Sequence, residues 1–442
     1  MKKTKNINIY YNLISNREFR KVRSKLKQKI YRGSYLNKDL RIRYNLVHYS
    51  PSKLKLYLVK DWYGITVPEN FCLIEDHEAS IKFLNKVRKI LEFDKPYNLE
   101  ISHLTTNNIG LGASFLFDSI IKTYEKKWAR KKRKIGLRGN FSGSREVNNF
   151  LVSYGLLYDL DIKYYNANKV DKDYASKLIT LKITGSQQNP DANSIASHRL
   201  ANYFQLCFKK VGINIEEDAI KKIESAISEI IGNAEEHCGN PNSEWHVLGF
   251  FNKDKSICNF SLINYGDTIY ESLSNKNSTS KEVLETVEKV ILSNASVWKK
   301  ITTNYDEYKE VLWNVMALQD GISSKKTAPG TEGSSRGQGL MEMLSFIDMI
   351  RNKDDNNKIA IISGKSKILV DYEYEIINKM YGETEVRQII FNKEQELHNL
   401  QDDSKAILMS DKFQGTIITG SFVINKTYLT QIIANNGKSK NN

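Results

Sequence analysis

Strand-like and helix-like stretches alternate along residues 96–185, and this alternation constrains the fold more than any other feature of the chain. The strand pattern YNLEISHL precedes the apolar helix pattern ASFLFDSIIKTYEKKW, and KIGLRG precedes EVNNFLVSYGLL and the strand pattern KLITLKIT. Elements of these lengths that alternate along a chain pack as helices against a sheet. The sequence therefore predicts an α/β domain over residues 96–185.

The chain of 442 residues is long enough for two or three domains with sizeable cores. The polar segment GSQQNPDANS follows the last of these strands and is typical of a linker, which we place at residues 186–195. A basic N-terminal region of residues 1–95 then precedes the α/β domain, and a further domain of residues 196–442 follows the linker.

The positive charge of the chain is concentrated near its beginning. Residues 1–60 contain 17 of the 66 lysine and arginine residues and two of the 51 acidic residues, so they account for the whole net charge of +15. Aromatic side chains are interleaved with these charges, a mixture that can follow a phosphate backbone and stack on bases. Residues 1–60 therefore either bind nucleic acid or form the solvated face of a lysine-rich helix.

Cysteine usage and hydrophobicity indicate the environment of the protein. The four cysteines lie far apart without the spacing of a zinc site, which fits a reducing compartment better than a disulfide framework. No stretch approaches the roughly 18–20 apolar residues of a membrane helix, and the first residues lack the apolar core of a secretion signal. We therefore expect a cytoplasmic protein that does not bind a membrane.

A helix with two distinct faces is predicted from about Glu216 to Gly239. Its isoleucines recur at helical spacing on one side, which indicates a face packed on a core. Glu229, Asn233 and His237 form a separate polar line, and side chains one helical turn apart lie about 5–6 Å from each other. A carboxylate and an amide oxygen at this spacing can share a water molecule and a cation. The alternative is an ordinary solvated helix face.

A glycine-rich loop and several strands follow this helix. The strand pattern CNFSLINYG ends at Gly266, two helix patterns follow, and TAPGTEGSSRGQGL then leads into an apolar helix. Small residues let backbone amides approach an anion, and the start of a helix attracts one. The strand patterns KIAIISG, KILVDYEY and GTIITGSFVI come last. A phosphate site is indicated, although the common Gly-x-x-x-x-Gly-Lys-Ser/Thr motif does not occur in the sequence.

Taken in order, four motifs resemble the GHKL ATPases, the superfamily of gyrase, Hsp90, histidine kinases and MutL. They are Glu-x-x-x-Asn-Ala-x-x-His, a strand ending in Gly266, Arg-Gly-x-Gly-Leu opening a helix, and a final Gly-Thr strand. The phrase AISEIIGNAEEHCG looks especially like the same helix of anti-sigma serine kinases and histidine kinase catalytic domains. The resemblance covers residues 196–442. It implies a Bergerat-type α/β sandwich, in which helices cover a mixed sheet, with ATP and Mg²⁺ as cofactors.

The resemblance also implies roles for the residues that match these motifs. Asn233 matches the residue that binds Mg²⁺ on the triphosphate. Glu229 matches the catalytic carboxylate that orients or deprotonates the attacking nucleophile. Arg336, Gly337 and Gly339 match the loop that closes on the phosphates.

Two strand ends would hold the adenine. Thr416 matches the hydroxyl that joins a water network at the base, and Gly266 closes the neighbouring strand motif. Asn264 stands where the family usually has Asp, the acceptor for the adenine amino group. An amide oxygen can still accept that bond, but the side chain is uncharged and can flip, so we expect weaker base selectivity. Asp267 would substitute only if the strand were shifted.

Residues 96–185 resemble the STAS-type domains of anti-sigma factor antagonists in the order and length of their elements. The phosphorylated serine of that family would fall between Thr106 and Gly110, where this chain has no serine. The resemblance therefore implies a smaller STAS-like α/β domain without that phosphorylation site. An unrelated α/β module is the alternative.

Three functions follow as hypotheses. The first is an Mg²⁺-dependent ATP-binding protein that hydrolyses ATP slowly and acts on a protein partner as a conformational switch. The second is a protein serine kinase of the anti-sigma type. The third is a nucleic-acid-binding module that nucleotide regulates, with residues 1–60 as the binding surface.

Overall fold

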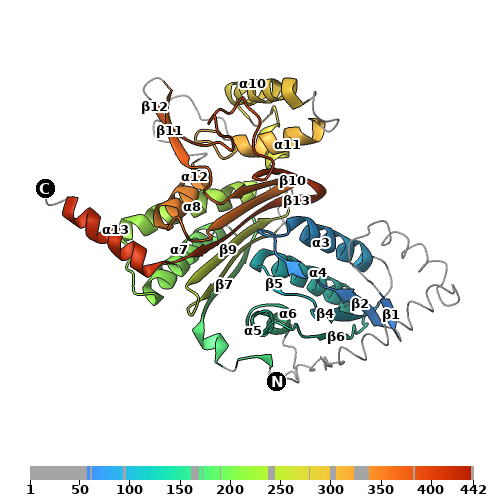
Figure 1. Cartoon of the computed structure of the whole chain (residues 1–442). Helices are drawn as coiled ribbons and strands as arrows, with labels where there is room; N and C mark the ends of the chain where they lie inside the picture. Colours follow the sequence, from blue (N-terminus) through green and yellow to red (C-terminus); the bar gives the residue numbers. More distant parts are fainter. Residues whose placement is uncertain are drawn as a thin grey trace. The chain divides into compact units, whose positions relative to one another are not determined.

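The structure is a computed structural model in which the chain forms two compact units, divided between Ser176 and Lys177. It describes residues 57–59, 62–92, 96–160, 169–171, 173–189, 191–236, 244–277, 279–298, 305–322, 338–381 and 384–439. The basic stretch of residues 1–56, His237, Arg336 and Gly337 lie outside the described residues. Figure 1 shows the elements of both units in sequence colours.

The first unit is an α/β layer built on a four-stranded sheet in the order β1-β2-β4-β6 (Figure 1). Strand β1 runs antiparallel to β2, whereas β2, β4 and β6 are parallel to one another. The strands are β1 (Tyr57–Val59), β2 (Trp62–Thr66), β4 (Asn98–Ser102) and β6 (Leu137–Asn140), and β3 (Asn70–Phe71) pairs separately with β5 (Asn108–Ile109). The α-helices are α3 (His77–Leu91), α4 (Leu111–Arg130), α5 (Arg145–Ser153) and α6 (Leu156–Asp159).

Aromatic side chains join the helices of this unit to its core. The ring of Phe83 on α3 lies 5.2 Å from that of Phe117 on α4, and both rings contact Phe71. Helix α3 begins where the Asp76 carboxylate accepts the backbone N–H of Ala79, a normal helix cap. The segment between Thr106 and Gly110, where the STAS-type phosphorylated serine would fall, contains β5 and leads directly into α4.

The boundaries of the first unit differ from those predicted. Trp62 pairs with Asn98 in neighbouring parallel strands, so the end of the predicted basic region belongs to the same sheet as the predicted middle domain. The strand β7 (Leu178–Gly185), which was assigned to that domain, pairs instead with β8 (Trp245–Asn252) of the second unit. A strand pattern carries no information on its partner, because the hydrogen bonds of a sheet join distant parts of the chain.

The second unit contains a five-stranded sheet in the order β10-β13-β9-β8-β7, with β9 (Ile257–Asn264), β10 (Lys358–Val370) and β13 (Ala406–Val423). All four neighbouring pairs of this sheet are antiparallel. The prediction of a mixed sheet for residues 196–442 is therefore wrong. The predicted strands KIAIISG and KILVDYEY are one strand, β10, whose pairing shifts at Gly364, where φ is +62°.

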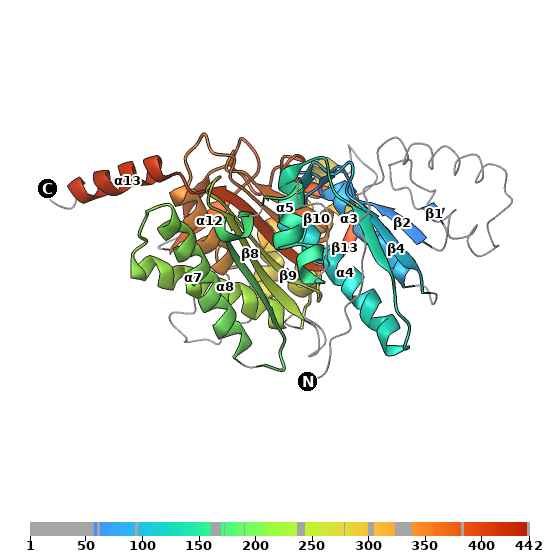
Figure 2. The same ribbon diagram turned by 90° about the horizontal axis from the view of Figure 1, so that it is seen from below.

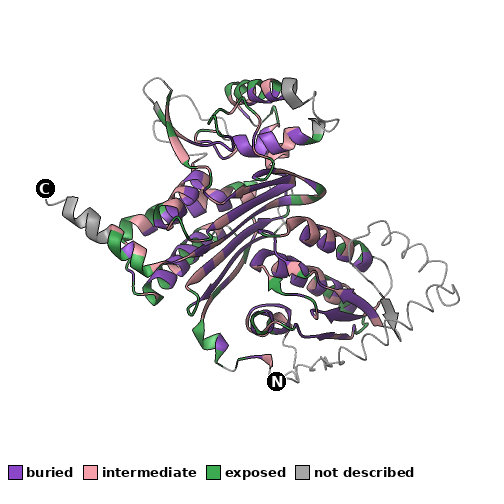
Figure 3. Ribbon diagram, viewed as in Figure 1, coloured by how far each residue is buried: buried purple, intermediate pink, exposed green. Residues whose placement is uncertain are grey.

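Three helices lie against one face of this sheet, as Figures 1 and 2 show. They are α7 (Ala192–Lys210), α8 (Glu217–Glu236) and α12 (Gly339–Ile350). Helix α7 begins within the predicted linker of residues 186–195, so the linker is shorter than expected. The ring of Phe204 on α7 packs against Phe260 on β9 and Phe422 on β13, and Figure 3 shows the sheet as largely buried.

The remaining elements of this unit come between the sheet strands along the chain, except α13, which follows β13. They are α9 (Ile269–Leu273), α10 (Lys281–Trp298), α11 (Tyr305–Met316), the hairpin of β11 (Ile376–Tyr381) and β12 (Thr384–Ile389), and α13 (Lys426–Ser439). Helices α10 and α11 confirm the two helix patterns expected between Gly266 and the glycine-rich loop. The helices of the described ranges include none that is long and apolar enough to cross a membrane.

Candidate functional site

Helix α8 supplies the first polar wall of a cavity in the second unit. Its isoleucines Ile220, Ile223, Ile227, Ile230 and Ile231 are buried, as the apolar pattern predicted. Glu229 and Asn233 lie one turn apart on α8, and both line a cavity of about 150 Å³. Asn233 is an exposed residue at this cavity.

The second polar wall comes from the sheet. Asn264 ends β9 and lies opposite Thr416 of β13 in the antiparallel register, and both residues line the same cavity. The backbone N–H of Thr416 donates to Oδ1 of Asn264 over 2.7 Å. Asn264 is only 5% exposed. This bond therefore fixes the orientation of its amide group.

A serine that sequence reasoning missed organises this wall. Oγ of Ser363 on β10 accepts the N–H of Ile269 over 2.9 Å and donates to the carbonyl oxygen of Gly415 over 3.0 Å. It also lies 3.0 Å from Oγ1 of Thr416. The single proton of Ser363 is used for Gly415, so the Thr416 hydroxyl donates to Ser363. A polar residue near the end of the apolar run KIAIIS was the only signal for it in the sequence.

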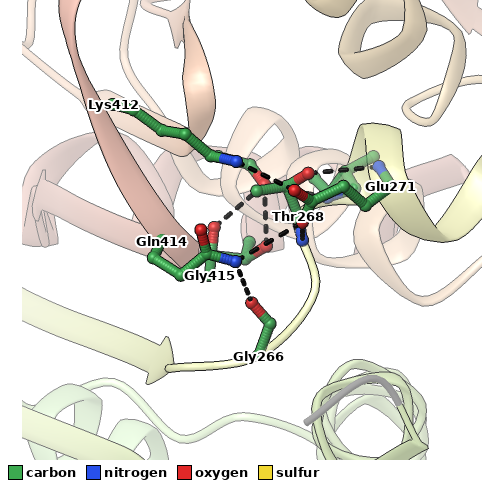
Figure 4. A network of polar contacts seen from close by, with 9 residues as sticks. Gly266, Thr268, Glu271, Lys412, Gln414 and Gly415 are labelled. Atoms are coloured by element: carbon green, nitrogen blue, oxygen red, sulfur yellow. Dashed lines mark hydrogen bonds and ion pairs between the residues drawn. The ribbon is translucent and has the colours of Figure 1, made fainter. Parts of the chain in front are cut away.

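Next to the cavity, charged and polar side chains fix the turn between β9 and α9 (Figure 4). Thr268 caps α9 in a reciprocal capping box with Glu271. Burial opposes ionisation of Glu271, but the ammonium of Lys412 at 2.8 Å and the donors of Thr268 outweigh it and lower the pKa of this carboxyl. Nε2 of Gln414 donates to the carbonyl oxygen of Gly266 over 3.2 Å.

Two glycines make this packing possible. Gly415 has a φ of +110°, a left-handed conformation, and a Cβ there would collide with the carbonyl oxygen of Asn264. Gly339 opens α12 directly against α8, and a Cβ there would lie 2.9 Å from the carbonyl oxygen of Ala226. The neighbouring N–H of Gln338 donates to Oε1 of Glu229 over 3.1 Å. The start of α12 therefore orients the Glu229 carboxylate.

Apolar side chains form most of the remaining wall. They come from the helices, the sheet and the segment after α11, and they include Ile230, Ala234, Trp245, Val247, Leu262, Ile269, Leu273, Ala317, Ile322, Leu340 and Ile418. A cavity of this volume with apolar walls can take up a small planar aromatic molecule. The cavity therefore combines room for a flat ring with polar groups at its edges.

His246 of β8 also lines the cavity and is almost fully buried. Burial lowers the pKa of its imidazole to about 4, so the ring is neutral at pH 7. Nδ1 of His246 lies 2.9 Å from the hydroxyl of Thr184, and the ring packs edge-on against Tyr265. At pH 7 this ring therefore brings no positive charge to the cavity.

Four of the predicted site residues lie at one cavity. Glu229, Asn233, Asn264 and Thr416 line the cavity, and Gly339 contacts Glu229 from outside the lining. Gly266 is buried, and its carbonyl is used by Gln414. Arg336 and Gly337 lie outside the described residues. Sequence reasoning missed Trp245, His246 and Ile322, since apolar and neutral residues of this kind carry no motif, whereas Leu340 ends the Arg-Gly-x-Gly-Leu motif.

The described residues contain no group of three or more histidine, cysteine, aspartate or glutamate side chains that could hold a metal ion. A cation at Asn233 would therefore take its other ligands from water or from a bound anion, as Mg²⁺ commonly does. The chain matches no model of a known protein family, and comparison with curated proteins gives no match either.

Proposed function

We propose that the second unit binds a purine nucleoside triphosphate with Mg²⁺, hydrolyses it slowly and uses the cycle as a conformational switch. One observation carries this proposal. Glu229 and Asn233 of α8 and Asn264 and Thr416 of the sheet are far apart in sequence, yet they line one cavity. These are the residues that the GHKL resemblance pairs with the metal, the nucleophile and the base, and ATP is the nucleotide which that resemblance implies.

The polar end of the cavity suits the phosphates. The amide oxygen of the exposed Asn233 is a hard donor of the kind that Mg²⁺ accepts, and such an ion supplies charge that offsets the triphosphate. Glu229 lies one turn away and is oriented by the Gln338 N–H. A carboxylate in this position can accept a proton from an attacking water or hydroxyl group.

The apolar end suits the base. Side chains such as Ile230, Leu262 and Leu340 line the space, and Asn264 and Thr416 supply hydrogen-bonding groups at its edge. Binding sites for planar heterocycles combine apolar walls with a few placed polar groups. We propose a Bergerat-type sandwich for this unit, and its α8–sheet cavity supports that proposal, although its sheet is antiparallel throughout its described pairs.

Substitution of Glu229 tests the proposed chemistry. In the Glu229→Gln protein we expect phosphate release to fall by at least 100-fold while calorimetric binding of the nucleotide is retained, because the amide cannot accept the proton. Glu217→Gln on the first turn of α8, whose side chain is 81% exposed, is the matched control and should leave turnover unchanged. Equal turnover in the Glu229→Gln and wild-type proteins would remove Glu229 from the mechanism.

Asn233 is tested through the metal. We expect the Asn233→Ala protein to lose the increase in nucleotide affinity that Mg²⁺ gives to the wild type, because the amide oxygen proposed to bind the ion is gone. Titration calorimetry with and without Mg²⁺ measures this increase. If no adenine or guanine nucleotide at millimolar concentration gives heat with the folded wild type, the proposed function is wrong.

A protein serine kinase of the anti-sigma type is the second candidate. The phrase AISEIIGNAEEHCG favours it, together with an α/β first unit for which we propose a STAS-like relationship. In this reaction Glu229 would act on a serine hydroxyl of the partner instead of water. Label transferred from the γ-phosphate to a co-purifying protein would support the kinase, and label released only as free phosphate would support hydrolysis.

A further inference from the structure

We infer that the cavity selects a purine with an oxygen at position 6, as in guanine and hypoxanthine, over adenine with its amino group. The inference rests on the proposed function, which sets residue 264 opposite position 6 of the base. It comes from the orientation of one amide group, that of Asn264. The observations that carry it are two hydrogen bonds within the sheet.

The first hydrogen bond fixes the orientation of the Asn264 amide. The backbone N–H of Thr416 can only donate, so the atom that it meets at 2.7 Å must be the oxygen of the amide and not its nitrogen. Asn264 lies at the end of β9, paired with Thr416, and is 5% exposed. Turning the amide over would set two N–H donors against each other in a buried place, which is costly. Nδ2 is therefore the end of the amide that remains for a ligand.

The second hydrogen bond fixes the Thr416 hydroxyl. Ser363 uses its proton for the carbonyl oxygen of Gly415 and accepts the N–H of Ile269. The bond between Ser363 and Thr416 at 3.0 Å is then donated by Thr416. The lone pairs of the Thr416 oxygen remain for a ligand. The cavity therefore offers a donor at Asn264 and an acceptor at Thr416.

A 6-oxopurine complements this pair. Its O6 accepts from Nδ2 of Asn264, and its N1–H can donate to Oγ1 of Thr416, directly or through one water molecule. The amino group of adenine in the same orientation would face Nδ2 with a second donor, and both groups would lose a partner on leaving water. An aspartate at position 264 could accept the Thr416 N–H with one carboxylate oxygen. Its second oxygen would then accept a hydrogen bond from the amino group of adenine.

Titration calorimetry of the full chain with Mg²⁺ and ATP, GTP or ITP tests the inference. We expect ITP and GTP to bind at least tenfold more tightly than ATP, and the Asn264→Asp protein to prefer ATP. ITP is the informative member, because its base differs from adenine only at position 6 and the N1 proton. Asn259→Asp is the matched control, since Asn259 lies on the same strand but donates to the carbonyl oxygen of Phe250. It should keep the wild-type order.

The outcomes separate this inference from the proposed function. Wild-type binding of ATP as tight as that of ITP, or tighter, would overturn the inference and leave the proposed function standing. An Asn264→Asp protein that folds and keeps the wild-type order would also overturn it. If that variant does not fold, the wild-type comparison alone decides. If none of the three triphosphates binds, the proposed function fails and the inference fails with it.

Discussion

At the scale of single residues, Gly339 shows how closely the candidate site is packed. A Cβ at this position would lie 2.9 Å both from the carbonyl oxygen of Ala226 and from Cβ of Glu229. We expect Gly339→Ala to push α12 away from α8, to weaken the Gln338–Glu229 bond and to lower the free energy of unfolding by about 1–3 kcal/mol. Urea unfolding measures the stability, and phosphate release should fall in parallel.

Gly232 on α8 provides the control for this substitution. A Cβ there would lie 3.5 Å from Nδ2 of Asn193, which is an ordinary contact. Alanine favours a helix over glycine by up to about 1 kcal/mol, so Gly232→Ala should leave the stability unchanged or raise it. A Gly339→Ala protein as stable as the wild type would contradict the close approach of α12 to α8.

The buried His246 should make the free energy of unfolding depend on pH. Its pKa is about 4 in the folded protein because of burial and 6.5 in the unfolded chain, so the unfolded state takes up the proton first as the pH falls. The free energy of unfolding should therefore decrease between pH 6.5 and pH 4 by roughly 3 kcal/mol from this residue, and level off below pH 4. Urea unfolding of the wild type and His246→Phe across this range measures the difference. The exposed His198 serves as the control through His198→Gln.

Local patterns predicted some residues of the site and could not predict others. Glu229 and Asn233 lie on one helix, so their spacing alone placed them on the same side of that helix. Asn264 and Thr416 were predicted as strand ends through motif order. Ser363 was missed because its role depends on Gly415 and Ile269, which come from other elements. Non-local hydrogen bonds of this kind leave no periodic signal in a sequence.

At the scale of elements, the hairpin of β11 and β12 is tied to the walls of the cavity by one arginine. Arg387 on β12 binds Asp320 through Nε at 2.8 Å and through a second nitrogen, and it reaches Glu342 of α12 at 2.9 Å. Asp320 lies two residues before Ile322 and Glu342 two residues after Leu340, and both of these apolar residues line the cavity. Arg387 is therefore a positioning residue for two walls.

Replacement of Arg387 should lower both the free energy of unfolding and the nucleotide affinity. In Arg387→Met the carboxylate of Asp320, which is 9% exposed, loses the guanidinium and keeps only the backbone N–H of residue 387, and we expect the free energy of unfolding to fall by about 3 kcal/mol. Nucleotide affinity measured by calorimetry should weaken at a pH and temperature where the variant is folded. Lys379→Met on the same hairpin removes a more exposed pair with Glu396 and should change neither quantity much. Equal effects in the two variants would show that Arg387 has no special role.

Whether a segment forms a helix or a strand was predicted better than which strands pair with each other. The helices predicted from about Glu216 and after Gly266 correspond to α8, α10 and α11. The boundary at residue 95 was wrong because β2 pairs with β4, and the one at residue 185 because β7 pairs with β8. Both errors have the same physical cause, since alternation within a strand records which face is buried and not which edge is paired.

At the scale of the whole molecule, ligand binding should stabilise one of the two units more than the other. Because the cavity lies within residues 177–442, a bound nucleotide at 100 times its dissociation constant should stabilise that unit by about 2.7 kcal/mol. Amide hydrogen exchange should slow most in α8, α9 and β13. The Asn233→Ala protein at the same nucleotide concentration is the control. Protection of β2 and β4 equal to that of α8 would contradict a site confined to the second unit.

From the positive charge concentrated in residues 1–60 we predict how nucleic-acid binding depends on salt. If these residues bind a phosphate backbone, affinity for DNA or RNA should fall linearly with salt on logarithmic axes, with a slope of about −0.9 for each duplex phosphate contacted. Fluorescence anisotropy at several salt concentrations measures this slope. A chain that begins at residue 61 should bind much more weakly, and equal binding would exclude residues 1–60 as the surface.

The bond from the Thr416 N–H to Asn264 has an evolutionary consequence. A carboxylate oxygen would satisfy this N–H as well as an amide oxygen does, so exchange of asparagine for aspartate leaves the pairing of β9 and β13 intact. One nucleotide change in a codon separates these two amino acids. If the cavity binds a purine nucleotide as proposed, a single point mutation could therefore change which nucleotide the protein prefers without passing through an ancestor that cannot fold.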